Sequence, residues 1–262
     1  MLYLFRQICQ KPWARFNAAF MFYTCVPLPQ WLPVEFYGIA QFAPIVGLVL
    51  ALWLWCLWWG LTAIGLSTGL VAAIVVAIWL RITGGLHLDG AMDTADGLGV
   101  MDPARRLAVM SDSRSGAYGV MAAIVILGMK TLALASLTQD HLWVLLAACS
   151  WSRWGQLAAI VRYPYIKPQG KGAFHREALT SPWQALPLLL LLFGLGFLPL
   201  SFGVSSVKLA FGLTVGSGVI SLLVGDWFQA QFGGQTGDTY GAIVEWSEVL
   251  ILVLANLLLA IG

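Results

Sequence analysis

The chain alternates long apolar runs with short polar segments. A helix that spans a bilayer needs about 20 mostly apolar residues, and the run from Ile39 to Leu80 contains no charged residue. Gly60 divides this run into two predicted spans. The same criterion predicts seven spans, over residues 39–59, 61–80, 117–137, 141–161, 184–202, 206–225 and 246–261. We therefore expect an all-α, polytopic integral membrane protein in which residues 1–262 form a single domain.

The stretch at residues 16–33 is apolar but does not fit an eighth span. Pro27, Pro29 and Pro33 interrupt it, and a proline removes a backbone donor and breaks a helix interior. The pattern favours a segment that lies in the membrane interface or re-enters it.

Composition supports the membrane assignment. Hydrophobic residues make up 60% of the chain and charged residues 10%, whereas soluble domains carry about 25% charged residues. The net charge of +2 indicates no polyanionic partner, so we expect no binding of nucleic acid. The four cysteines are scattered, without the spacing of a zinc site or a disulfide framework. An ordinary soluble enzyme and a DNA-binding module are excluded.

Lysine and arginine segregate to one side of the predicted topology. They occur in the N-terminal segment and in the 81–116 and 162–180 loops, whereas the loops on the opposite side have none. Cytoplasmic loops carry the excess of these residues, so we expect the long loops, with residues 226–242, to lie on the cytoplasmic face. Lys130, Arg153 and Lys208 fall in or beside spans, and we expect them to snorkel to the interface.

Acidic residues are rare, yet five of the twelve lie between Asp89 and Asp112. Asp89, Asp93 and Asp96 are spaced i, i+4 and i+7, which places three carboxylates on one helix face. Like charges at this spacing destabilise a helix unless a cation lies among them. Oxygen ligands suit a hard cation, and Mg²⁺ fits best. A solvated acidic helix is the alternative.

Residues on both sides of these carboxylates add to the candidate chemistry. Gly84 and Gly85 end the preceding span and let the backbone turn. His87 either orients a group or accepts a proton, or it makes a structural hydrogen bond. Farther along, Asp112 is a further candidate metal ligand, and Arg114 offers a planar fork for a phosphate. A turn followed by a helix cap is the alternative for this second element.

A glycine-rich segment near the C-terminus is the third candidate element. Gly234, Thr236 and Gly237 belong to a run whose backbone N–H groups can approach phosphate oxygens closely. Asp238 and Glu245 are seven residues apart and would share a helix face. The pattern indicates a binding loop, with a flexible connector as the alternative.

The basic loop that contains Arg162, Lys167 and Lys171 also carries glycines and aromatic residues. It suits the phosphates and rings of a nucleotide. A positive-inside topology signal explains the same residues equally well. The inventory on this face is that of Mg²⁺-assisted phosphoryl transfer, and local chemistry does not name the substrate.

Three motifs together resemble a known family. The stretch TGGLHLDGAMDTADGLG at residues 83–99 resembles the signature of the cobalamin synthase family. MSDSRSGAYG at 110–119 and GGQTGDTYGA at 233–242 are similar to the later motifs of that family, in the same order. The resemblance extends over nearly the whole chain and includes TCVPLP at 24–29.

The resemblance implies a transferase of cobalamin biosynthesis in the bacterial inner membrane, with its active site facing the cytoplasm. A hydroxyl of α-ribazole, or of its 5′-phosphate, would attack the cobinamide-linked phosphorus of adenosylcobinamide-GDP. GMP would leave, and adenosylcobalamin or its 5′-phosphate would form, with Mg²⁺ as cofactor. The implied partners are these two substrates and the lipid bilayer, and a homo-oligomer is compatible with the sequence.

The resemblance also assigns roles to individual residues. Asp89, Asp93 or His87 would accept the proton of the attacking hydroxyl. The implied metal ligands are Asp89, Asp93, Asp96, Asp112, Asp238 and Glu245. The implied substrate-binding residues are Arg114, Arg162, Lys167, Lys171, Gly234, Thr236 and Gly237.

Two positions depart from the family pattern, because Cys25 and Lys167 stand where arginines are expected. Neither side chain can make a bidentate contact with a phosphate. A CDP-alcohol phosphotransferase is one alternative, since Asp93 to Gly97 matches the start of its motif, but the Ala-Arg pair that should follow is missing. A cation- or proton-coupled transporter is the other, and it would carry its carboxylates near the middle of spans.

Overall fold

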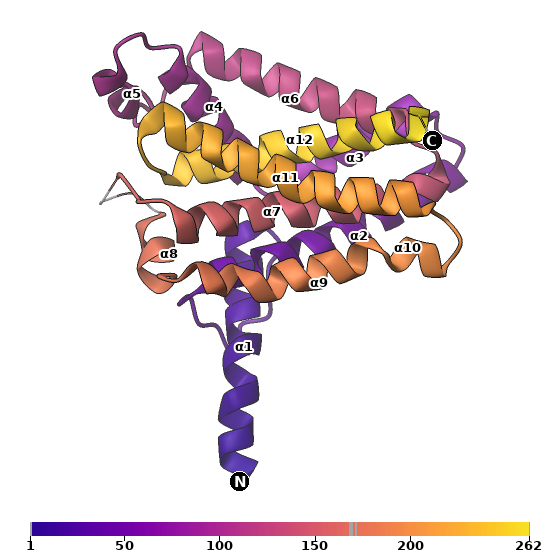
Figure 1. Ribbon diagram of the computed structural model, residues 1–262, viewed down its shortest axis with the longest axis horizontal. Coiled ribbons are helices and arrows are strands. Elements are labelled where there is room, and N and C mark those ends of the chain that lie inside the picture. Colours follow the sequence, from indigo (N-terminus) through magenta and orange to yellow (C-terminus); the bar gives the residue numbers. More distant parts are fainter. Residues whose placement is uncertain (1, 168–169, 171, 262) are drawn as a thin grey trace.

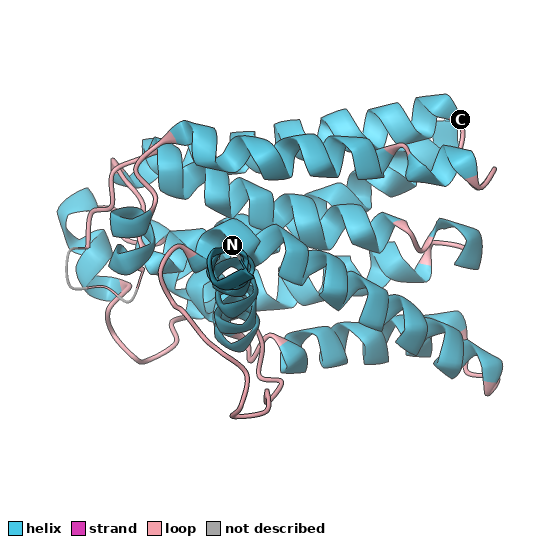
Figure 2. Cartoon of the chain, turned by 90° about the horizontal axis from the view of Figure 1, so that it is seen from below, coloured by secondary structure: helices cyan, strands magenta, loops and turns pink. Residues whose placement is uncertain are grey.

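The computed structural model describes residues 2–167, 170 and 172–261, and the regular structure of these residues is helical (Figure 1, Figure 2). The α-helices are α1 Leu2–Tyr23, α2 Ala43–Ala63, α3 Thr68–Ile82, α4 Leu86–Leu98, α5 Pro103–Val109, α6 Ala117–Ala135, α7 Val144–Arg162, α8 Ala173–Ala178, α9 Leu186–Gly196, α10 Leu198–Ser201, α11 Val207–Phe232 and α12 Gly237–Ile261. Short 3₁₀ helices at Ile39–Phe42, Gln139–His141 and Pro182–Ala185 precede α2, α7 and α9. The predicted all-α fold is confirmed.

Six helical stretches in the described residues are long and apolar enough to cross a bilayer. They are Ile39–Ala63, Ala117–Ala135, Gln139–Arg162, Pro182–Ser201, Val207–Phe232 and Gly237–Ile261. Helices α3 and α4 pass the same test only as a pair, which is bent by 90°. The prediction of a polytopic membrane protein with about seven spans is therefore confirmed, with the bent pair as the seventh.

Two span boundaries differ from the prediction. Gly60 lies inside α2, and the chain turns instead at residues 64–67, where Gly65 has a φ of 86°. Only a glycine adopts this left-handed conformation without strain, so Gly65 rather than Gly60 ends the helix. Helix α12 begins at Gly237 and not at residue 246, so Asp238 and Glu245 both lie within it.

Helix α1 runs across the direction of the other helices (Figure 1), and in Figure 2 it is seen end-on. Its last turns pack Ala18, Ala19 and Phe20 against the start of α2. The chain then leaves the helix, and the Cys25 N–H donates to the carbonyl of Ile82 at the end of α3 (2.6 Å). Residues 16–33 therefore combine a helix end with a non-helical strap, and their interfacial placement stays a prediction.

Helix α7 is the central helix of the bundle and contacts α2, α11 and α12. Glycines allow these close approaches. A Cβ on Gly155 would lie 2.7 Å from the Cβ of Ser221 on α11, and one on Gly47 of α2 would collide with the backbone of Cys149. Small residues at such crossings let membrane helices pack closely.

A buried ion network joins three of the spanning helices. Lys130 of α6 lies 2.6 Å from a carboxylate oxygen of Glu245 and 2.5 Å from one of Glu248, both on α12. The second oxygen of Glu248 lies 2.7 Å from Arg153 of α7. All four side chains are buried. Lys130 and Arg153 therefore do not snorkel to the interface as predicted, because the two glutamates neutralise them inside the bundle.

We expect the Glu248→Gln substitution to destabilise the protein by about 3–5 kcal/mol, because it leaves excess positive charge buried. The measurement is thermal unfolding of the purified protein in detergent. Glu177→Gln makes the same chemical change at an exposed position of α8 and should leave the melting temperature unchanged.

A double substitution tests the same network independently. The protein with both Arg153→Met and Glu248→Met should be more stable than the one with Arg153→Met alone, because removal of both partners leaves no unpaired charge at this contact. Wild-type stability of Glu248→Gln would contradict a role of the network in folding.

Candidate functional site

A cavity of about 440 Å³ opens at the end of the bundle where α4 and α8 meet the N-terminus of α12 (Figure 1). It brings together several residues that the sequence analysis selected, namely His87, Asp89, Asp93, Asp112, Lys167, Gly237 and Asp238. Side chains that the sequence analysis did not select also line it, among them Phe22, Gln156, Tyr165, His175 and Tyr240. Residues from helices distant in the sequence thus form one site.

The bend between α3 and α4 aims the acidic helix at this cavity. Gly84 and Gly85 have φ angles of 63° and 70°, which only glycine adopts without strain. The predicted turn at this pair is therefore confirmed. Along α4, Asp89 is exposed and Asp93 is half-buried, and both line the cavity.

Two glycines bring α4 against α12. A Cβ on Gly90 would lie 2.6 Å from the carbonyl oxygen of Asp238, and a Cβ on Gly241 would lie 2.8 Å from that of His87. No larger side chain fits at either crossing without displacing the backbone. Because the helices approach so closely, the carboxylates of Asp89 and Asp238 share one cavity.

Most residues of the glycine-rich segment before α12 make contacts that hold the local fold together. Gly233, with a φ of 76°, ends α11. The backbone of Gln235 pairs with Pro164 and Ile166 (2.8 and 2.9 Å), and Thr236 exchanges capping hydrogen bonds with Thr239. These contacts hold the basic loop beside the start of α12.

Gly234 and Thr236 do not line the cavity, and their contact with a phosphate stays a prediction. Gly234 is buried with its Cα against the side chain of Ile166, and Thr236 is completely buried with its hydroxyl accepting from the N–H of Thr239. Gly237 is the member of this predicted set that reaches the cavity.

The basic side chains that were predicted to bind substrate do not all lie at the cavity. Lys167 lines the cavity, and its ammonium lies 3.6 Å from Asp238 Oδ2, which has no hydrogen-bond partner. Arg162 instead lies 3.3 Å from Asp226 of α11 and is not part of the cavity wall. Lys171 lies outside the described residues.

Asp112 and Arg114 form an exposed ion pair at the rim (2.7 Å). Hydrogen bonds from Arg114 lower the pKa of Asp112 to about 2. Asp112 lines the cavity, whereas Arg114 is not among its lining residues. Arg114 therefore reaches a bound phosphate only by exchanging its present partner.

Asp96 and Glu245 do not lie with the other candidate metal ligands. Asp96 accepts hydrogen bonds from the N–H groups of Gly116 (2.7 Å) and Gly119 (2.8 Å), so it caps the N-terminus of α6. It shares a helix face with Asp89, but seven residues along an α-helix separate them by about 10 Å. Glu245 belongs to the buried ion network, paired with Lys130.

The remaining candidate metal ligands are the carboxylates that line the cavity. No three His, Cys, Asp or Glu side chains in the described part of the chain form a metal site by themselves. Mg²⁺ in phosphoryl-transfer enzymes takes only one or two carboxylates and completes its shell with phosphate oxygens and water. One or two of the carboxylates of Asp89, Asp93 and Asp238, which line the same cavity, fit that mode of binding.

The buried wall of the cavity was missed by the sequence analysis. Gln156 and Arg153 lie one turn apart in an otherwise apolar span, and a polar pair in a span is a signal of function that the sequence does carry. His175 lies in the basic loop, where burial lowers its pKa to about 4. Its place against Tyr23 follows only from the tertiary structure.

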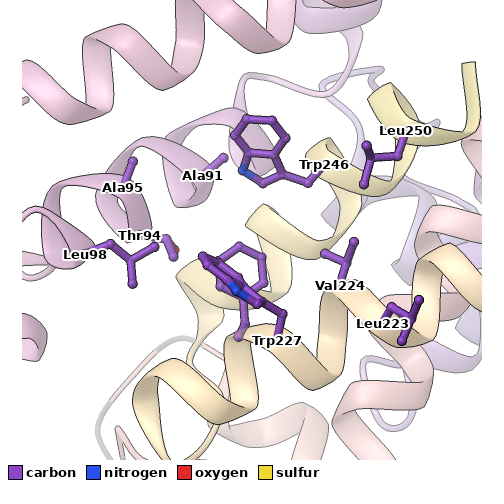
Figure 3. Close-up of a pocket in the computed structure, with 10 residues that line it drawn as sticks. Ala91, Thr94, Ala95, Leu98, Leu223, Val224, Trp227, Trp246 and Leu250 are labelled. Atoms are coloured by element: carbon purple, nitrogen blue, oxygen red, sulfur yellow. The ribbon is translucent and has the colours of Figure 1, made fainter. Parts of the chain in front are cut away.

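A second cavity, of about 420 Å³, lies on the opposite face of α4 (Figure 3). Ala91, Thr94 and Leu98 line it from α4, and Trp227 and Trp246 line it from α11 and α12. This wall is apolar and offers no carboxylate or cation. Of these two cavities, the first is the one whose lining includes carboxylates and a lysine.

The sequence is similar to those of known proteins over most of its length. Residues 15–256 match the family model of cobalamin-5-phosphate synthase. The chain is 47% identical to an adenosylcobinamide-GDP ribazoletransferase of Trichormus variabilis, over 92% of this chain and 96% of the relative. It is 49% identical to proteins of the same name from Synechocystis sp. (90% and 92%) and Thermosynechococcus vestitus (92% and 95%).

No solved structure matches the chain. The family match nevertheless covers α4, residues 110–113 and the start of α12, all of which contribute to the wall of the acidic cavity. The chain belongs to the cobalamin-5-phosphate synthase family.

Proposed function

We propose that this protein is an adenosylcobinamide-GDP ribazoletransferase. It would transfer the cobinamide-phosphate moiety of adenosylcobinamide-GDP to α-ribazole, or to α-ribazole 5′-phosphate, and release GMP. The relatives bear this name, and the chain aligns with nearly their whole length. The observation that carries the proposal for this chain is that two cavities meet at Asp89.

The two cavities differ in shape in a way that suits two different substrates. The acidic cavity is narrow and polar, whereas a broad groove of about 1040 Å³ runs between the end of α1 and the bend of α3 and α4. Phe22, Leu86 and Asp89 line both. A group transfer requires two substrates to meet at the reacting atom, and the larger volume of the broad groove suits a bulky corrinoid.

The bond changes are those of phosphoryl transfer. A ribazole hydroxyl oxygen bonds to the cobinamide-linked phosphorus, the bond from that phosphorus to the oxygen of GMP breaks, and the hydroxyl proton leaves to a base. Asp89 and Asp93 are the carboxylates placed to accept the proton. His87 is the alternative base, since both of its ring nitrogens lack hydrogen-bond partners.

The side chains of the cavity rim would hold the diphosphate. Lys167 neutralises phosphate charge from the side of Asp238, and the N–H groups at the start of α12 face the same space through Gly237. Mg²⁺ held by one or two of the carboxylates of Asp89, Asp93 and Asp238 would supply charge neutralisation at the diphosphate. Asp96 and Glu245 are excluded from this proposed ligand set because their oxygens serve α6 and Lys130.

The distribution of charge supports a site that faces the cytoplasm of a bacterial inner membrane. The loops that contain α5 and α8 lie at the end of the bundle that carries the cavity (Figure 1). These loops carry Arg105, Arg106, Arg114, Arg162 and Arg176, and positively charged loops stay on the cytoplasmic side.

The alternative function, that of a cation- or proton-coupled transporter, has less support. In the described part of the chain the buried acids are Asp96, Glu245 and Glu248. Asp96 caps α6, and the two glutamates are paired with Lys130 or Arg153, so none of these buried carboxylates is free to carry a cation.

The reaction is tested with the purified protein in liposomes, adenosylcobinamide-GDP and α-ribazole. We expect GMP and adenosylcobalamin in equal amounts by mass spectrometry, loss of both products with EDTA, and recovery with Mg²⁺. Folded protein that forms no product with both substrates and Mg²⁺ present would contradict the transferase assignment. Unchanged turnover in EDTA would contradict the metal assignment alone.

Two aspartates of α4 should respond differently to the same substitution. Asp93→Asn is expected to lower kcat/KM by roughly 100-fold or more and to raise the Mg²⁺ concentration that gives half-maximal rate, with little change in melting temperature. Asp96→Asn should cost about 1 kcal/mol of stability by weakening the cap of α6, while the Mg²⁺ dependence stays that of the wild type. The measurements are Mg²⁺ titration of activity and thermal unfolding. A shifted Mg²⁺ dependence in Asp96→Asn would return Asp96 to the metal ligands.

A further inference from the structure

The buried wall of the acidic cavity contains polar atoms that nothing in the protein satisfies. His87, Gln156, His175 and Tyr240 line the cavity, and each is less than 5% exposed. Both ring nitrogens of His87, Nδ1 of His175, Oε1 of Gln156 and the hydroxyl of Tyr240 lack a hydrogen-bond partner. Leaving such a group unpaired costs about 1–3 kcal/mol. Several of them along one wall indicate that a ligand supplies their partners.

The same wall is built from flat rings. Tyr23 lies behind it, with its ring 6.0 Å from that of His87 at 24° and 6.2 Å from that of His175 at 7°. Phe22 meets His175 edge-on at 5.1 Å. On the α12 side, Tyr240 pairs with Tyr165 at 5.9 Å. Ring-lined walls with a few polar tips favour a planar ligand that also forms hydrogen bonds.

The side chains that line the cavity are charged near its mouth and neutral in its deeper part. Asp89 is exposed, and Asp93 and Lys167 are half-buried. The antiparallel contact of α4 with α12 places Gly90 against Asp238 and, one turn deeper, His87 against Gly241. His175 is uncharged at neutral pH, because burial lowers its pKa to about 4. A molecule with a phosphate at one end and a planar ring at the other would therefore enter with the ring inward.

From this arrangement we propose that His87, Gln156, His175 and Tyr240 form a subsite for the planar nitrogen heterocycle of a nucleoside. This inference rests on the proposed function and deepens it, because both proposed substrates carry such a ring: the benzimidazole of α-ribazole and the guanine of the donor. The cavity of about 440 Å³ accommodates a nucleoside. The unpartnered nitrogens and hydroxyl bind the heteroatoms of the ring, and the aromatic faces contact its plane.

The test uses substitutions that remove the hydroxyl of Tyr240 and Oε1 of Gln156, two of the atoms without a hydrogen-bond partner. Tyr240→Phe and Gln156→Leu are measured in the full-length protein in nanodiscs, by calorimetric titration with α-ribazole and with GMP. We expect affinity for one of these ligands to fall about tenfold. The melting temperature should stay equal or rise, since the lost atoms have no partner in the protein. Tyr37→Phe, at an exposed tyrosine outside the cavity, is the matched control and should change neither quantity.

Each outcome has a defined meaning. Weaker binding of α-ribazole with unchanged binding of GMP assigns the subsite to the acceptor, and the reverse assigns it to guanine; either result supports a base subsite. Wild-type affinity for both ligands in both variants would overturn it, as would a fall in affinity that merely follows a fall in melting temperature.

Turnover is measured separately. Loss of the proposed function would leave the wild type without turnover even where it binds a nucleoside, whereas failure of the subsite alone would leave turnover intact and the variants binding normally.

Discussion

A closed set of buried charges sets the arrangement of the helices around the site. In hydrocarbon an unpaired ionised side chain costs several kcal/mol, so the ammonium of Lys130 and the guanidinium of Arg153 require acidic partners at matching depth. Glu245 and Glu248 supply them from α12. The contacts determine how far α12 lies along α6 and α7. The position of Asp238, two turns earlier on α12, and therefore the shape of the acidic cavity, follow from them.

Different parts of helix α4 contact α12, line the acidic cavity and cap α6. Its start contacts α12 through Gly90, its acidic face lines the cavity, and Asp96 near its end holds the first turn of α6. The cap and the carboxylates of the cavity therefore lie on one helix. A change in the loop before α6 would reach the site through Asp96, and also directly through Asp112, which lines the cavity.

The sequence predicted the helical membrane fold, the turn at Gly84 and Gly85 and the cavity carboxylates, because each depends on local pattern. It did not separate Asp96 from Asp89, since helical periodicity reports the face of a helix and not the distance along its axis. Glu245 was placed with the metal ligands because its partner Lys130 lies more than a hundred residues away in the chain. The buried wall was missed for the same reason: Phe22, Gln156 and His175 come from three separate segments.

The order of charges along the chain has a consequence for biogenesis. The two buried cations, on α6 and α7, emerge from the ribosome well before the glutamates of the last helix. During synthesis the growing bundle therefore holds uncompensated positive charge in the bilayer, and it becomes electrically neutral only when α12 inserts. A ribosome that stops before α12 therefore leaves Lys130 and Arg153 in the bilayer without their acidic partners, even though α7 can still contact α2 and α11.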